Sequence, residues 1–209
     1  LGRKCRTWQG DLTSGSGGGL FEHLKATRVD VLINNAAAAP QLKRLEELTA
    51  SDYQRTFSLN LYVPYRLMQA AIQSMRPRGS GVIVNVCSLA GRRAIRNVSL
   101  YCASKFALRG LTESVAQELE GTGIRCFSVS PGGMATSMRQ DLFKDAAKQQ
   151  DPAFVAQVVV DAITGKIIVP QAWDLVIRGS EFTVLPTERW TGIVMENTRN
   201  RPYSSELPV

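Results

Sequence analysis

Short runs of branched apolar residues alternate along this chain with longer stretches of helical character. The apolar runs are residues 29–33, 81–87, 124–130 and 167–178. Strands and helices that alternate with short connections predict one parallel α/β sheet with helices on both faces. Because open sheets of this kind bind ligands at the carboxyl ends of their strands, the residues that follow each run are the candidates for a functional site.

A serine, a tyrosine and a lysine follow the second apolar run. Ser88 comes directly after it, and Tyr101 and Lys105 lie farther along. A helix over 99–120 places Tyr101 and Lys105 one turn apart on one face. An ammonium group beside a phenol favours the phenolate, so we expect Lys105 to lower the pKa of Tyr101 toward neutrality. The spacing alone is weak evidence for a catalytic pair. Tyr101 can equally be a packing residue on the helix, and Lys105 a solvated charge.

Other motifs stand at matching places along the chain. They are Asn34-Asn35-Ala36-Ala37 at the end of the first run, Asn60, Pro131-Gly132 and Thr136. Taken with Ser88 and Tyr101-x-x-x-Lys105, their order resembles the short-chain dehydrogenase/reductase superfamily from about residue 11 to about residue 178. Several spaced motifs seldom coincide by chance.

The resemblance implies a Rossmann-like, doubly wound parallel sheet in a single domain over residues 1–209. It also implies an NAD(P)-dependent oxidoreductase that transfers a hydride between a nicotinamide cofactor and a carbonyl or alcohol substrate. In that family Tyr101 is the acid/base, Lys105 lowers its pKa and holds the ribose, and Ser88 orients the carbonyl. Asn60 stands at a helix irregularity, where its carbonyl helps to hold a water linked to the lysine.

The same resemblance implies a set of cofactor contacts. Asp11 and Leu12 are expected at the adenine, and the Thr136 hydroxyl at the nicotinamide carboxamide. The full expected set is Asp11, Leu12, Asn34, Ala36, Tyr101, Lys105, Pro131, Gly132 and Thr136. The chain carries a net charge of +7, which slightly favours NADP over NAD.

The family's first strand, glycine turn, helix and second strand are not found in these 209 residues. We therefore expect an N-terminally truncated sheet in which the strand at 29–33 has an exposed edge. The glycines of residues 13–19 do not match G-x-G-x-x-G, so a flexible loop is preferred to a phosphate cradle. Two hypotheses follow: an oxidoreductase, or a truncated, non-catalytic chain that acts as a binding or assembly module.

The connections predict the walls of a substrate pocket. Loop 89–98 is expected to form one wall through Ala94 and Ile95. Arg92 and Arg93 in that loop either contact a negative substrate or are solvated, and solvation is preferred. Residues 137–150 are expected to form a mobile lid.

Capping residues and prolines predict where the helices begin and end. Thr49 or Ser51 caps a helix that Pro64 kinks or restarts. Asp151 and Pro152 begin another helix, and the chain from about 180 to 209 is expected to be irregular.

The amino-acid composition argues against membrane, metal-binding and nucleic-acid-binding proteins. A hydrophobic content of 44% and a charged content of 21% are typical of a soluble globular protein without a membrane span. Cys5, Cys87, Cys102 and Cys126 lack ligand spacing, so we expect reduced thiols, a cytoplasmic location and no metal site. The dispersed arginines do not suggest nucleic-acid binding. The resemblance implies a homodimer or homotetramer joined through the long helices.

Overall fold

The computed structural model describes residues 7, 9–14, 19–142 and 149–186. Its helices are α1 (Leu20–Ala26), α2 (Ala50–Phe57), α3 (Val63–Met75), α4 (Ser99–Glu118), α5 (Ser137–Leu142) and α6 (Pro152–Ile163). Its strands are β1 (Val31–Asn34), β2 (Gly81–Val86), β3 (Ile124–Pro131), β4 (Asp174–Arg178) and β5 (Glu181–Leu185). Single turns η2 (Leu45–Glu47), η4 (Arg76–Arg78) and η5 (Leu89–Gly91) are 3-10 helices, and η3 (Ser58–Tyr62) is a π-helix. None of the described helices is both long and apolar enough to cross a membrane.

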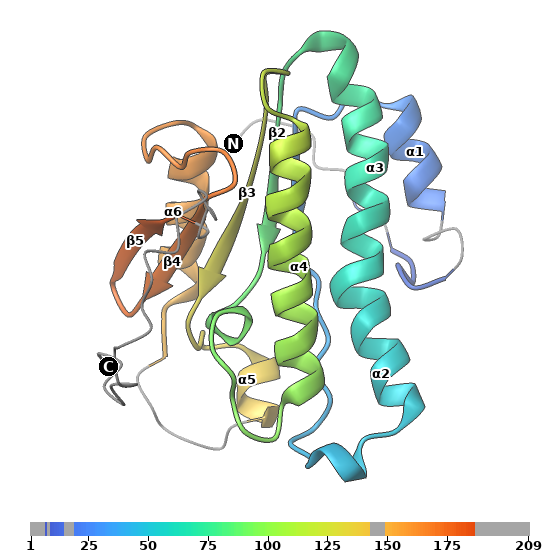
Figure 1. Ribbon diagram of the computed structural model, residues 1–209, viewed down its shortest axis with the longest axis vertical. Helices are drawn as coiled ribbons and strands as arrows, with labels where there is room; N and C mark the ends of the chain where they lie inside the picture. The colour runs from blue at the N-terminus through green and yellow to red at the C-terminus, as the bar shows by residue number, and fades with distance from the viewer. Residues whose placement is uncertain (1–6, 8, 15–18, 143–148, 187–209) are drawn as a thin grey trace, which may run out of the picture.

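The strands form one sheet in the order β1-β2-β3-β4-β5 (Figure 1). The first four strands are parallel, and β5 pairs antiparallel with β4. The register sets Asn34 opposite Asn85, and Val84 opposite Phe127. The predicted α/β sheet is therefore confirmed.

Helices cover both faces of the sheet, as the alternation predicts. On one face, α1, α3 and α4 lie side by side, and α6 covers the other face (Figure 1). Successive strand residues point to opposite faces, so Ile83 joins the core under α3 while Val84 joins the core under α6. This packing fixes the carboxyl ends of β1, β2 and β3, where the predicted site residues lie.

The first strand is buried on one face only. The side chains of Val31 and Ile33 are 40% and 47% exposed, whereas Leu32 and Asn34 are buried. Among the described strands, β1 pairs with β2 alone, and the core under α6 contains residues of β2, β3 and β4 but none of β1. One face of β1 is therefore open, because α6 packs against β2, β3 and β4.

Two helices begin at the predicted capping residues. The Thr49 hydroxyl accepts a hydrogen bond from the amide of Asp52, and the Asp151 carboxylate accepts one from the amide of Ala153. The prediction of an irregular chain from residue 180 is wrong at its start, because Glu181–Leu185 form β5. Residues 187–209 lie outside the described residues.

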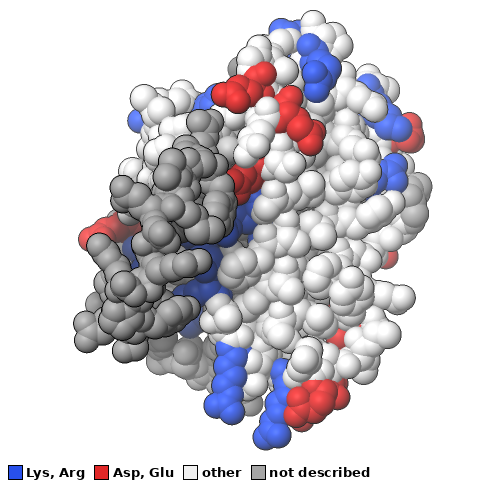
Figure 2. All heavy atoms as spheres, in the orientation of Figure 1, with Lys and Arg blue, Asp and Glu red and all other residues white. Residues whose placement is uncertain are grey.

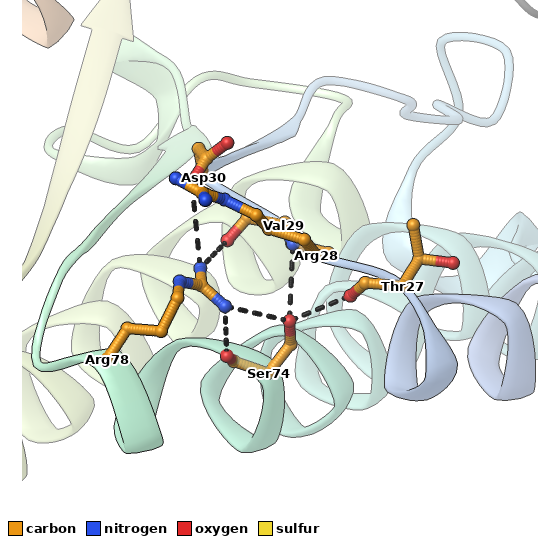
Figure 3. Close-up of polar contacts among 6 residues, drawn as sticks. All are labelled: Thr27, Arg28, Val29, Asp30, Ser74 and Arg78. Atoms are coloured by element: carbon orange, nitrogen blue, oxygen red, sulfur yellow. Dashed lines mark hydrogen bonds and ion pairs between the residues drawn. The ribbon is translucent and has the colours of Figure 1, made fainter.

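The entry into β1 is fixed to the end of α3 by side chains (Figure 3). The Ser74 hydroxyl accepts a hydrogen bond from the Val29 amide over 3.2 Å and donates one to the Thr27 carbonyl over 2.8 Å. Arg78 donates to the carbonyls of Ser74 and Val29 and lies 3.7 Å from the carboxylate of Asp30. These bonds hold the segment between α1 and β1 against the end of α3.

Replacing Ser74 with alanine tests this junction. The buried Val29 amide then loses its acceptor, so we expect the free energy of unfolding to fall by about 1–3 kcal/mol. Gln73→Ala, at the exposed neighbouring position of α3, is the matched control and is expected to change it by less than about 0.5 kcal/mol. Urea unfolding followed by circular dichroism measures both, and equal losses would contradict the role given to Ser74.

Candidate active site

Ser88 stands where β2 ends and η5 begins. Its hydroxyl accepts a hydrogen bond from the amide of Ala90 over 3.1 Å and lies near enough to the phenol of Tyr101 to lower the pKa of that group. The η5 turn packs closely on α4, since a Cβ built on Gly91 would lie 2.8 Å from the carbonyl oxygen of Lys105. A glycine at position 91 therefore lets η5 pack against α4, which brings Ser88 near Tyr101.

Helix α4 presents Tyr101 and Lys105 on one face, as the spacing predicts. Lys105 is 2% exposed, and its Nζ donates a hydrogen bond to the carbonyl of Val86 over 2.9 Å. The same Nζ lies 5.8 Å from the centroid of the Tyr101 ring. The ammonium thus lies beneath the ring and is held by the strand that delivers Ser88.

Burial, rather than the lysine, governs the pKa values in this site. Loss of solvent raises the pKa of Tyr101 above its usual value, and the hydrogen bond from Ser88 partly opposes the change. Burial also lowers the pKa of Lys105. The expected fall of the Tyr101 pKa toward neutrality is therefore not found in this structure, because the cost of removing the phenolate from water exceeds the stabilisation by the neighbouring groups.

Asn60 lies in the π-helical turn between α2 and α3 and is fully buried. Its side chain bonds both the amide and the carbonyl of Ala38, over 2.7 and 2.8 Å, and donates to the Ser104 hydroxyl over 2.9 Å. Pro64 has no N–H for the Asn60 carbonyl four residues earlier, which removes the α-helical partner of that carbonyl. The predicted helix irregularity at this asparagine is present.

One cavity of about 190 Å³ brings together many of the predicted residues at the carboxyl ends of β2 and β3. Ser88 and Tyr101 line it together with Pro131, Gly132 and Thr136. Its remaining wall residues are Cys87, Leu89, Ala90, Arg93, Ile95, Val98, Gly133, Met134, Met138 and Arg139. Lys105 and Asn60 are buried and are not among its lining residues.

The predicted walls are partly confirmed. Ile95 lines the cavity, but Ala94 is exposed and is not among the lining residues. Helix α5 supplies Met138 and Arg139, which sequence reasoning did not single out; residues 143–148 of the predicted lid lie outside the described residues. A single methionine or arginine in a polar stretch carries no local signal that it faces a pocket.

Arg92 is not solvated. Its Nη1 lies 2.6 Å from Oδ2 of Asp174, whose side chain is fully buried. The hydroxyls of Ser128 and Ser130 each donate to the same carboxylate over 2.8 Å. The preferred solvated state is therefore wrong for Arg92, because β4 places a carboxylate beneath loop 89–98.

A second hollow, of about 240 Å³, gathers part of the expected cofactor set. It lies at the end of β1, and its lining includes Leu12, Asn34 and Ala36. Asn34 donates to the Asn85 side chain over 2.7 Å, while its own Oδ1 is buried without a hydrogen-bond partner. Asp11 lines neither cavity: it is exposed, and its carboxylate accepts hydrogen bonds from Thr13, which lower its pKa.

Cys87, beside Ser88, and Cys126 in β3 are free, buried thiols. Burial raises the pKa of each from 9.0 to about 12. A thiol with a raised folded-state pKa contributes stability that is complete below the unfolded value and is lost as the pH rises toward the folded value, since the unfolded chain releases its proton first.

The free energy of unfolding should therefore fall between pH 9.0 and about 12. The expected slope is at most about 1.4 kcal/mol per pH unit for each thiol. Urea unfolding at pH values through this window measures the slope. Cys87→Ala removes one of the titrating groups and should flatten it, and an unchanged slope in that variant would contradict the assignment.

Comparison with known proteins agrees with this geometry. The family model described as short chain dehydrogenase matches residues 2–147. The chain belongs to the short-chain dehydrogenase family. It is 37% identical over 146 residues to 2,3-dihydro-2,3-dihydroxybenzoate dehydrogenase of Escherichia coli K12, a match that covers 69% of this chain and 58% of that protein. The chain therefore spans little more than half the length of this relative.

Solved structures show the same fold. A 4-hydroxyisoleucine dehydrogenase mutant complexed with NADH and succinate has a TM-score of 0.75 at 26% identity, covering 82% of this chain and 77% of its own. A structure described as an NAD(P) dependent gluconate 5-dehydrogenase from Beutenbergia cavernae, with NADP at low occupancy, has a TM-score of 0.60 at 30% identity, covering 76% and 59%. Structural relatives of this chain thus hold nicotinamide cofactors of both kinds.

Proposed function

We propose that this chain carries the catalytic part of an NAD(P)-dependent oxidoreductase that acts on a carbonyl or alcohol substrate. The observation that carries the proposal is that Ser88 and Tyr101 line one cavity together, with the buried Lys105 ammonium 5.8 Å from the centroid of the Tyr101 ring. Proton transfer to or from a substrate oxygen is the chemistry that such a pair supports.

Each of these side chains has a role in that proton transfer. Because burial raises its pKa, Tyr101 keeps its proton at neutral pH and donates it to a carbonyl oxygen, which favours reduction. Ser88 offers a second hydroxyl to the same oxygen and fixes its position. The nearby charge of Lys105 stabilises the phenolate that remains. Asn60 holds the helix turn and the Ala38 loop around this group.

The described residues fit a nicotinamide cofactor at two places. Pro131, Gly132 and Thr136 line the catalytic cavity, where Thr136 has a hydroxyl for a carboxamide. The hollow lined by Leu12, Asn34 and Ala36 is largely apolar, which suits the face of a flat base. A bound nicotinamide supplies the hydride. The net charge of +7 makes NADP the preferred form in this proposal.

The proposed protein is a homodimer or homotetramer in the cytoplasm. An apolar groove between α2, η3 and α4 supports self-association, because it includes Tyr53, Phe57, Tyr62 and Leu111, and Tyr53 and Tyr62 are about half exposed. Sedimentation analysis tests this assembly. The three buried free thiols of the described residues agree with a reducing compartment.

Turnover of carbonyl compounds tests the function. The purified chain is mixed with NADPH or NADH and a panel of ketones, keto acids and quinones, and loss of the reduced nicotinamide is followed by absorbance. We expect carbonyl-dependent oxidation that is larger with NADPH. If the folded chain oxidises neither cofactor with any carbonyl, the proposal is refuted. The remaining hypothesis is then a non-catalytic chain that acts as a binding or assembly module.

A further inference from the structure

The catalytic cavity is built from two segments that follow neighbouring strands. Loop 89–98 follows β2 and Ser88, and Ile95 and Val98 are among the lining residues that it supplies. The second segment, 131–136, begins at the end of β3 and supplies further lining residues. Strand pairing fixes β2 against β3 but does not by itself fix the chain beyond the ends of the strands. The shape of the cavity therefore depends on what connects these two segments.

The buried carboxylate of Asp174 bonds to both segments. Its Oδ2 accepts a hydrogen bond from Nη1 of Arg92, in loop 89–98, over 2.6 Å and another from the hydroxyl of Ser130 over 2.8 Å. Its Oδ1 accepts a third, over 2.8 Å, from the hydroxyl of Ser128. Ser130 lies at the end of β3, where the second segment begins. One carboxylate thus connects the two halves of the cavity without being among its lining residues.

Arg92 anchors its loop to the sheet. Figure 2 shows basic side chains in the recess beside α4, at the level of the loop between β2 and α4. The side chain of Arg92, however, is only 21% exposed and is paired with Asp174. The backbone amide of Arg92 donates to the carbonyl of Leu89 over 3.0 Å, and the amide of Gly91 donates to the carbonyl of Ser88 over 2.8 Å. The η5 turn therefore transmits the position of the guanidinium to Ser88.

Stability alone does not account for a carboxylate at this place. The side chain of Asp174 is fully buried, and the buried residues Leu175, Val176 and Ile177 follow it in β4. Removing two charges from water is costly, and an apolar replacement of a buried ion pair often leaves a protein equally stable. A fully bonded polar group differs from an apolar one because it specifies one arrangement of its partners. The three bonds of Asp174 therefore specify the geometry of the segments that they join.

We propose that Asp174 is a positioning residue of the catalytic cavity, because it fixes loop 89–98 and the segment 131–136 relative to each other. In this arrangement the loop directs a carbonyl toward Ser88 and Tyr101 while the nicotinamide lies on the second segment. The identity of these ligands rests on the proposed oxidoreductase function. The order of the two segments can be measured without turnover, so the two proposals fail separately.

The test is Asp174→Asn, which keeps the size of the side chain and one acceptor oxygen but removes the charge that binds Arg92. Hydrogen exchange measured by mass spectrometry should be at least about tenfold faster than in the wild type in peptides that cover 88–98 and 131–136. We expect kcat/KM for carbonyl reduction to fall by about 10–100-fold, because small displacements of a bound substrate are costly in rate. Both are measured on samples that circular dichroism shows to be folded.

Ser74→Ala is the matched control for the loss of stability. It is expected to destabilise the chain at the entry to β1, which lies at the opposite edge of the sheet from the cavity. Both kcat/KM and the exchange of the two peptides should stay within about twofold of wild type in this variant, because the sites are independent.

Arg92→Lys is a milder variant that serves if Asp174→Asn does not fold. Lysine keeps the positive charge but lacks the planar guanidinium that reaches the carboxylate here. The bonds from Ser128 and Ser130 remain, so exchange should become faster in 88–98 and stay unchanged in 131–136. The value of kcat/KM should fall at least about threefold. Unchanged exchange of 88–98 in this variant would contradict the role given to the ion pair.

A folded Asp174→Asn chain whose exchange and kcat/KM both stay within about twofold of wild type would overturn the inference. So would an equal loss of activity in Ser74→Ala, because the effect would then follow from stability alone. Faster exchange at both segments in a chain that turns over no carbonyl would support the positioning role while the oxidoreductase proposal failed. Undiminished turnover by Asp174→Asn would leave the oxidoreductase and refute the role of Asp174.

Discussion

Replacing Asp174 with alanine is expected to lower the free energy of unfolding by about 3–5 kcal/mol. The carboxylate is fully buried and is bound by Arg92, Ser128 and Ser130, over 2.6, 2.8 and 2.8 Å. Without it a guanidinium that is only 21% exposed keeps its charge with no counter-ion, and two buried hydroxyls lose their acceptor. A loss of this size is a large share of the stability of an ordinary domain.

Asp161→Ala is the matched control for this change. Asp161 also pairs with a cation, Lys166 at 3.1 Å, but the lysine side chain is 71% exposed. Such exposed pairs contribute about 0–1 kcal/mol. Urea unfolding followed by circular dichroism compares the two variants. A loss below about 1 kcal/mol for Asp174→Ala would show that the buried pair does not hold the loop to the sheet.

Replacing Tyr101 with phenylalanine is expected to lower kcat for carbonyl reduction by about 10²–10⁴-fold. The variant keeps the ring over the Lys105 ammonium and loses only the hydroxyl that donates the proton. Loss of this one hydroxyl should lower the free energy of unfolding by at most about 0.5–1.5 kcal/mol, too little to unfold the chain. The apparent affinity for the reduced nicotinamide should stay within a few-fold of wild type.

Tyr53→Phe is the control for this variant, since Tyr53 is 51% exposed on α2 and stacks on Phe57 away from the cavity. Steady-state rates with NADPH and the best carbonyl of the panel measure both variants. If Tyr101→Phe kept more than a tenth of the wild-type rate, another group would have to donate the proton.

The parts of the fold that local patterns specify could be predicted from the sequence. The first three apolar runs gave their strands to within about two residues, whereas only the end of the run 167–178 forms β4. Thr49 and Asp151 cap the helices that they were expected to cap. The spacing of Tyr101 and Lys105 was enough to place both on one face of α4. Propensity, capping and helical period act over a few residues, so they are visible in a single sequence.

Features that depend on distant contacts were not predicted. Asp174 lies in an apolar run, and its partner Arg92 is 82 residues away, so no local pattern links them. The direction of the Tyr101 pKa shift depends on how far the phenol is removed from water. The spacing of residues along the helix gives no information about this burial. Strand β5 did have a signal: Gly179 and Ser180 form a two-residue turn before alternating residues, as hairpins require.

Titration of NADPH and NADH into the purified chain, followed by nicotinamide fluorescence, tests the central claim most directly. The wild type and Tyr101→Phe are both expected to bind saturably, because the Pro131–Thr136 turn and the Asn34 hollow are intact in each. Thermal unfolding measured on the same samples shows whether each chain is folded. Saturable binding that Tyr101→Phe retains while losing turnover is the predicted result. A folded wild-type chain that binds neither cofactor would contradict the assignment of this site to nicotinamide-dependent catalysis.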